Sequence, residues 1–65
     1  MTITVNGTDS QLGRGGSVRD LLTTMGLPDK GIAVAIDGMV VPRSRWDTVL
    51  DDGAAVEIVT AVQGG

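Results

Sequence analysis

Hydrophobic and polar residues alternate at the start of the chain, which is the pattern of a half-buried β-strand. Ile3 and Val5 share one face of this strand. The Asn6-Gly7 pair that follows accepts the positive φ angles of a type I′ turn. A polar segment, residues 8–12, then runs back, and its polarity suits an edge strand that should not recruit other chains. The first segment therefore predicts a β-hairpin.

A single helix is predicted after this hairpin. Ser17 and Asp20 have the spacing of a capping box, in which each side chain accepts a hydrogen bond from the backbone N–H of the other residue. Gly26 can adopt the left-handed conformation that ends a helix. Between these signals, the apolar residues recur at helical spacing and form one stripe, which consists of Val18, Leu21, Leu22 and Met25.

A second hairpin is predicted after the helix. Residues 32–36 place large branched side chains on one face and alanines on the other. Asp37-Gly38 is a second candidate for a type I′ turn. Residues 39–41 then return, and Pro42 ends regular strand pairing because it has no N–H to donate.

The rest of the chain is a longer connection and one final strand. Within the connection, residues 43–50, we expect Trp46 and Leu50 to fold back over one end of the core. The final strand is predicted over residues 55–62. Its inward positions are Val56 and Ile58, and its outward positions are Glu57, Val59 and Ala61.

This order of elements predicts an α+β fold of the β-grasp type, a mixed sheet of four or five strands with one helix packed on one face. We expect the first and last strands to lie side by side and parallel at the centre of the sheet. The domain should comprise residues 1–61, and residues 62–65 should form a flexible C-terminal tail. The predicted core consists of Ile3, Val5, Leu12, Val18, Leu21, Leu22, Met25, Leu27, Ile32, Val34, Ile36, Leu50, Val56 and Ile58.

The sheet face opposite the helix should be flat and mildly apolar. Its predicted members are Thr2, Thr4, Ala33, Ala35, Val59 and Ala61. Such a face can simply be solvated, because scattered apolar residues are normal on protein surfaces. The alternative is a docking surface for a partner, which Val59 and Ala61 favour because they lie on the strand that leads to the tail.

Composition limits the chemistry that the chain itself can perform. Its 65 residues include no Cys, His or Tyr. The usual thiol nucleophile, the neutral-pH base, disulfides and the common zinc ligands are therefore missing. A domain of this size buries only about 60% of its unfolded surface, which leaves little room for an enclosed cleft. We therefore expect a protein that is not itself an enzyme.

Charge and hydropathy limit the partners. A net charge of −3 and a single aromatic residue, Trp46, provide neither the basic surface nor the stacking platform of a nucleic-acid binder. The longest apolar run, residues 32–36, is too short to span a membrane, and no secretory signal precedes the first strand. The sequence thus predicts a cytoplasmic protein that is a monomer when free and whose partners are proteins.

Two other patterns have a functional alternative. The glycine-rich residues 13–16 suggest a phosphate loop, but Val18 stands where a dinucleotide fingerprint needs glycine, and the Gly-Lys-Ser/Thr ending of a P-loop is absent. Arg43, Arg45 and Trp46 could form a docking patch. Two arginines beside a Trp are more often a solvated loop with one anchoring aromatic residue, and we interpret them so. The glycines are interpreted as a flexible connection.

The sequence ends on Gly64 and Gly65, directly after its most strand-like run. Glycine has no Cβ, so such a tail can enter a channel too narrow for any side chain and bring its carboxylate into the active site of another protein. A frayed end is the plainer alternative. Because the chain lacks other reactive groups, the carboxylate of Gly65 is the best candidate for a reactive group.

Six segments of the chain resemble those of a known family: residues 4–7 (TVNG), 18–22 (VRDLL), 34–38 (VAIDG), 40–46 (VVPRSRW), 52–53 (DG) and 56–65 (VEIVTAVQGG). In these segments, which extend over essentially the whole chain, the protein is similar to the ThiS-type sulfur carriers of thiamine biosynthesis, which have a ubiquitin-like β-grasp fold. It departs from the family pattern at residues 37–39, Arg45 and Ala54, where we expect surface charge and partner affinity to change.

The resemblance implies a carrier and not a catalyst. In this family, an E1-like adenylating enzyme uses ATP and magnesium to activate the terminal carboxylate, which here belongs to Gly65. A sulfur donor that bears a persulfide then converts it to a thiocarboxylate, and thiazole synthase receives the sulfur. The resemblance implies no cofactor bound by this chain. The residues that would thread the tail into a partner are Val62, Gln63 and Gly64.

Three alternatives stay open at this point. The small subunit of molybdopterin synthase ends likewise and uses the same chemistry, although such chains are usually longer. A ubiquitin-like protein modifier would form isopeptide bonds to lysines. An interaction module, finally, would carry its Gly-Gly ending incidentally.

Overall fold

The computed structural model describes residues 1–28 and 30–60 of the chain. These residues form five strands, one α-helix and one 3-10 helix: β1 (Thr2–Val5), β2 (Thr8–Gln11), α1 (Val18–Thr24), β3 (Ile32–Ile36), β4 (Met39–Val41), η1 (Arg43–Arg45) and β5 (Ala55–Thr60). The strands make one mixed sheet in the order β2-β1-β5-β3-β4. The predicted α+β fold, with one helix and a mixed sheet of the β-grasp type, is confirmed.

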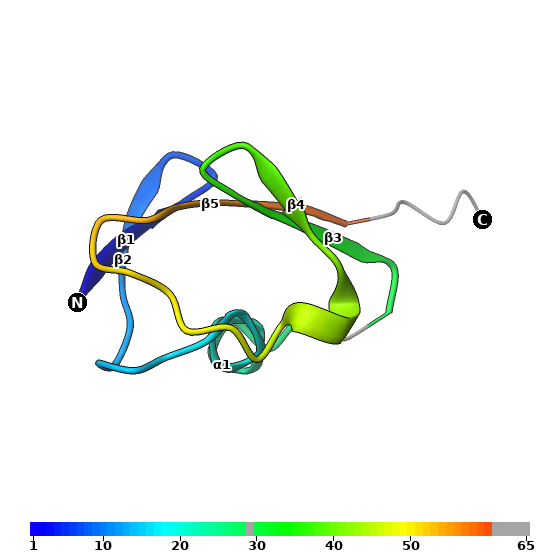
Figure 1. Cartoon of the computed structure of the whole chain (residues 1–65), viewed down its shortest axis with the longest axis horizontal. Helices are drawn as coiled ribbons and strands as arrows, with labels where there is room; N and C mark the ends of the chain where they lie inside the picture. Colours follow the sequence, from blue (N-terminus) through cyan, green and yellow to red (C-terminus); the bar gives the residue numbers. More distant parts are fainter. Residues whose placement is uncertain (29, 61–65) are drawn as a thin grey trace.

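The last strand lies at the centre of the sheet. β5 pairs parallel with β1, where Val5 is opposite Val56, and antiparallel with β3 from Ile36↔Val56 to Ile32↔Thr60. β2 and β4 are the outer partners of the two hairpins. In Figure 1, α1 lies below the sheet, and no other element of the described chain covers the opposite face. The parallel pairing expected for the first and last strands is therefore present.

Both hairpins turn as their sequences predict. The φ angles are 51° at Asn6 and 82° at Gly7 in the first turn, and 49° at Asp37 and 85° at Gly38 in the second. Positive φ at both central positions is the requirement of a type I′ turn, whose twist matches that of the flanking strands. The two turns therefore set the register of the strand pairs on either side of β5.

The ends of α1 are closed by hydrogen bonds. The Ser17 hydroxyl accepts from the Asp20 N–H (3.2 Å), and the Asp20 carboxylate accepts from the Ser17 N–H (2.9 Å), as the capping box predicts. At the other end, the Leu27 N–H donates to the Leu22 carbonyl (2.9 Å), and Gly26 has a φ of 71°. This is a Schellman arrangement, in which the residue after the glycine packs back toward the helix.

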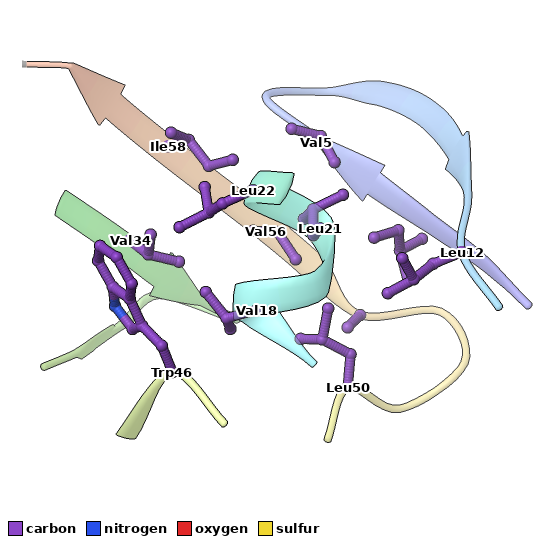
Figure 2. Packing of buried hydrophobic residues seen from close by; sticks show 12 residues of the cluster. Val5, Leu12, Val18, Leu21, Leu22, Val34, Trp46, Leu50, Val56 and Ile58 are labelled. Carbon is purple, nitrogen blue, oxygen red and sulfur yellow. The ribbon is translucent and has the colours of Figure 1, made fainter. Parts of the chain in front are cut away.

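The core lies between α1 and one face of the sheet. Figure 2 shows side chains from the helix, the strands and the long connection gathered in a single cluster. Most of the predicted core is confirmed as buried, and three further predicted members, Leu27, Ile32 and Ile36, are half-buried at its margin. The buried members that the sequence predicts are Ile3, Val5, Leu12, Val18, Leu21, Leu22, Val34, Leu50, Val56 and Ile58.

Two expectations about the core are wrong. Met25 is 44% exposed, because α1 ends at Thr24 and Met25 is its C-cap, from which the chain turns away from the sheet. Leu27 packs against the core in its place. Ala54, expected at the surface, is 5% exposed, because its N–H and carbonyl are bonded to Asp51 and Thr4 as the chain enters β5.

The long connection closes one end of the core, as predicted. Trp46 is 2% exposed, and its indole N–H donates to the carbonyl of Val41 (3.2 Å). Its own carbonyl accepts from the N–H of Arg19 (2.9 Å). Trp46 therefore joins the end of β4, through its indole, to the start of α1, through its backbone carbonyl, and its side chain lies inside the core and not on a surface patch with the two arginines.

The glycine-rich loop before α1 has a packing role that its interpretation as a flexible connection missed. A Cβ on Gly16 would lie 2.6 Å from the Cγ of Leu12 and 2.9 Å from the carbonyl oxygen of Gly13. The Gly16 carbonyl also accepts from the N–H of Leu50 (2.8 Å). Glycine is needed here because the backbone passes directly over a core side chain.

Replacing Trp46 by Ala should lower the free energy of unfolding by about 3 to 5 kcal/mol, the range for removing a large buried aromatic side chain. That is a large share of the roughly 5 to 15 kcal/mol by which small domains are stable. Urea denaturation followed by circular dichroism measures the change. Val49→Ala is the control from the same connection, and because Val49 is 57% exposed it should change stability by no more than about 0.5 kcal/mol. Equal effects of the two substitutions would contradict the role assigned to Trp46.

Candidate functional site

The candidate site begins where the described part of β5 ends. Thr60 is the last described residue, and the antiparallel ladder to β3 reaches it through Ile32↔Thr60. Among the predicted site residues, Val59 lies within the described chain. The others lie outside the described residues: Ala61, Val62, Gln63, Gly64 and Gly65. Their assigned roles, and the boundary between residues 61 and 62, stay predictions.

Val59 lies on the uncovered face of the sheet, as its alternation with Val56 and Ile58 predicts. Its side chain is 64% exposed, whereas those two neighbours are buried against the helix. Across the ladder Val59 is opposite Ala33 of β3, which is also exposed. A small residue opposite a branched one leaves room beside the Val59 side chain, and the face is hollowed there.

Two shallow hollows adjoin Val59. One, of about 320 Å3, is lined by Gly31, Ile32, Ala33 and Val59. The other, of about 120 Å3, continues across the sheet from Val59 toward Val40 of β4, with Glu57 at its border. Ala33 and Val59 line both hollows, so these two residues lie where the hollows adjoin. We refer to Ala33, Ala35, Val40 and Val59 as the outer face.

Val40 is a member of the outer face that sequence reasoning missed. It is 76% exposed and is opposite Ala35 in the β3–β4 hairpin. All three residues of β4 are apolar, so alternation of polarity could not tell which of them faces outward. The register of the type I′ turn was the available signal, because it places Val40 beside an alanine already assigned to this face.

The predicted open face differs in composition from one side to the other. The β1 side carries Thr2 and Thr4, and Thr4 is half-buried. The apolar exposure is concentrated instead on the β5, β3 and β4 side, which is the side nearer to the end of β5. An apolar area next to the strand that leads to Gly65 fits a surface that binds a partner better than it fits a uniformly solvated sheet.

In residues 1–28 and 30–60, no group of three or more Asp, Glu, His or Cys side chains is placed to hold a metal ion. Within the same residues, no helix is long and apolar enough to cross a membrane. The ion pair between Arg19 and Asp47 (2.9 Å) is well exposed and links α1 to the connection, away from the outer face.

Comparison with known proteins shows similarity to one family and to solved structures. The sequence model of the ThiS family matches residues 3–65. The crystal structure of the thiamine biosynthesis protein ThiS from Geobacter metallireducens superimposes with a TM-score of 0.80 at 32% identity, over all of both chains. A solution structure of a thiamine biosynthesis protein from the same organism gives 0.79 at 32% identity, over all of this chain and 88% of the other. No curated protein gives a significant match.

The family match extends from β1 to the final Gly-Gly, and the structural match includes every element of the sheet and the helix. The resemblance inferred from residues 40–46 and 56–65 is therefore confirmed by two independent comparisons. On this agreement of sequence and fold, the chain belongs to the ThiS family.

Proposed function

We propose that this protein is a sulfur carrier of thiamine biosynthesis and that its working group is the α-carboxyl of Gly65. The observation that carries the proposal is the family match, which includes the terminal Gly-Gly. The position of β5 supports it, because the strand that leads to these glycines is paired on both sides within the sheet. The strand from which the terminus extends would therefore be held in place by the sheet.

The carboxylate needs activation before it can accept sulfur. An α-carboxyl group has a reference pKa of about 3.3 to 3.7, so it is ionised at neutral pH and is a poor electrophile. In the proposed reaction, an E1-like enzyme with bound ATP and magnesium supplies the activation: a carboxylate oxygen attacks the α-phosphorus, and pyrophosphate leaves. The resulting acyl-adenylate has AMP as a good leaving group.

Sulfur then replaces the adenylate. The terminal sulfur of a protein persulfide attacks the acyl carbon, and AMP leaves with the bonding electrons. A thiol cleaves the sulfur–sulfur bond of the acyl disulfide, which yields a C-terminal thiocarboxylate and a disulfide. Thiazole synthase is the proposed acceptor of this sulfur. The chain has no Cys, so no internal thiol competes for its own activated terminus.

The tail would carry the carboxyl group into the partner. Gly65 lies five positions after Thr60, and five extended residues reach at most about 17 to 18 Å. Val62 and Gln63 would span the entrance of the active site. Gly64 and Gly65 would occupy its narrowest part, because neither has a side chain.

The outer face would dock the adenylating enzyme. Val59 and Val40 are its large exposed members, and the hollow that both residues line, together with the second hollow beside Val59, can receive apolar side chains of a partner. Ala61 is the next outward position along the strand and would extend the same contact. Docking through residues close to the tail keeps the distance between the contact and the reacting carboxyl short.

Deleting Gly65, or adding one Ala after it, should abolish thiocarboxylate formation and leave the unfolding curve unchanged. Both changes move the carboxyl group by one residue, about 3.5 Å, from the site of adenylation. Intact mass spectrometry, after incubation with the adenylating enzyme, ATP and a persulfide donor, measures the exchange of one oxygen for sulfur. Sulfur incorporation by either variant would contradict the mechanism. Covalent adducts to lysines of other proteins would instead indicate a protein modifier.

Replacing Val59 by Asp should weaken binding to the adenylating enzyme about tenfold or more, because a charge would be buried in an apolar contact. Val49→Asp is the matched control, since Val49 has a similar exposure (57% against 64%) but lies on the connection. Isothermal titration calorimetry measures both dissociation constants. If the two variants bind equally well, the outer face is not the docking surface.

A further inference from the structure

The side-chain amide of Asn6 is hydrogen-bonded twice to one residue of β5. Its Nδ2 donates to the carbonyl of Ile58 (3.1 Å), and its Oδ1 accepts from the N–H of Ile58 (2.8 Å). An Asn side-chain amide carries its oxygen and one of its N–H groups on the same side, so it can bond to both the N–H and the carbonyl of a single strand residue. The amide therefore takes the place that the backbone of a neighbouring strand would occupy beside Ile58.

This contact continues a backbone ladder that has just ended. β1 stops at Val5, and the backbone N–H of Asn6 makes the last main-chain bond to β5, to the carbonyl of Val56 (2.9 Å). The chain then turns away at Gly7. Without the amide, the N–H and carbonyl of Ile58 would face the side of the departing strand with no protein partner. Among the described residues, Ile58 is the last position at which β5 is held from the β1 side.

The other hairpin holds the opposite end of β5 in a similar way. The backbone N–H of Asp37 donates to the carbonyl of Ala55 (2.8 Å), and its carboxylate accepts from the N–H of Ala55 (3.1 Å). Asn6 and Asp37 occupy the same position of their type I′ turns, with φ near 50°. One turn residue therefore holds the start of the strand, and the other holds the part that leads toward the tail.

Turn geometry alone does not explain why Asn stands at position 6. Glycine would satisfy the positive φ angle at least as well, and Asp serves the equivalent position of the second turn. Asn6 is exposed, so it contributes little to the core. Asp would lack the donor to the Ile58 carbonyl, and glycine would lack both groups. Only an amide side chain satisfies both groups of Ile58.

We propose that Asn6 is a positioning residue of the carrier, whose side-chain amide holds β5 at Ile58 and so sets the direction in which the chain leaves the sheet toward Gly65. The inference rests on the proposed carrier function. Ile58 lies next to Val59 of the outer face, so the amide would also fix the direction of the tail relative to the docking surface. A docked carrier then presents its carboxyl group in one orientation, which is the condition for efficient in-line attack.

The test compares Asn6→Gly with Asp37→Gly. Each substitution removes one side chain that is bonded to β5 and keeps a residue that tolerates positive φ, so both should lower stability to a similar extent in urea denaturation. Only Asn6→Gly acts at the part of the strand nearest the tail. Asn6→Asp is a third variant, which retains the acceptor for the Ile58 N–H and loses the donor to its carbonyl.

Two measurements follow on the folded proteins. Amide hydrogen exchange should be about tenfold or more faster at Ile58 in Asn6→Gly, and unchanged there in Asp37→Gly. In ATP–pyrophosphate exchange catalysed by the adenylating enzyme, kcat should fall about threefold to tenfold for Asn6→Gly, with the dissociation constant for the enzyme within about twofold of wild type. The kcat of Asn6→Asp should lie between those of Asn6→Gly and the wild-type protein. Asp37→Gly should keep the wild-type kcat.

Two results would overturn the inference: unchanged exchange at Ile58 in Asn6→Gly, or equal values of kcat in Asn6→Gly and Asp37→Gly. If the enzyme does not adenylate the wild-type protein, the proposed function is refuted, and so is the role of Asn6 in that reaction. Hydrogen exchange at Ile58 would in that case still decide whether the amide holds the strand.

Discussion

The parallel pairing of β1 with β5 is the interaction on which the rest of the structure depends. It brings the first and last strands together at the centre of the sheet, and it leaves each hairpin to extend the sheet outward. Strands at the centre have their backbone groups satisfied on both edges, and so they are the hardest to displace. The segment that leads to the proposed reactive terminus is therefore built on the most firmly held strand of a small domain.

A domain with a single two-turn helix can cover only one face of such a sheet. Val18, Leu21 and Leu22 bury that face, and Trp46 and Leu50 close the end that the helix does not reach. The opposite face is left open by this shortage of covering elements. Val40 and Val59 are exposed on this face, and each is opposite an alanine of β3. Because the helix covers only one face of the sheet, the other face remains available to a partner.

The sequence predicted the local features well because their causes are local. Both type I′ turns, the capping box of Ser17 with Asp20 and the inward positions of β5 follow from spacing and from the preferences of single residues. The errors arise where an element ends. Met25 continues the helical stripe in sequence, but the Schellman turn at Gly26 withdraws it and brings Leu27 to the core. Ala54 was expected at the surface only because it departs from the family pattern, whereas its backbone bonds to Asp51 and Thr4 draw it inward.

The sequence by itself determined the elements, the turns, most of the core and the family to which the chain belongs, because periodicity, turn preference and motif order are all properties of neighbouring residues. The tertiary structure alone decided two matters. It bonds the Trp46 indole to the Val41 carbonyl at the end of β4, and it places the Asn6 amide against Ile58. Each of these is a contact between separate elements of the chain, and such contacts exist only once strand register and helix position are fixed together.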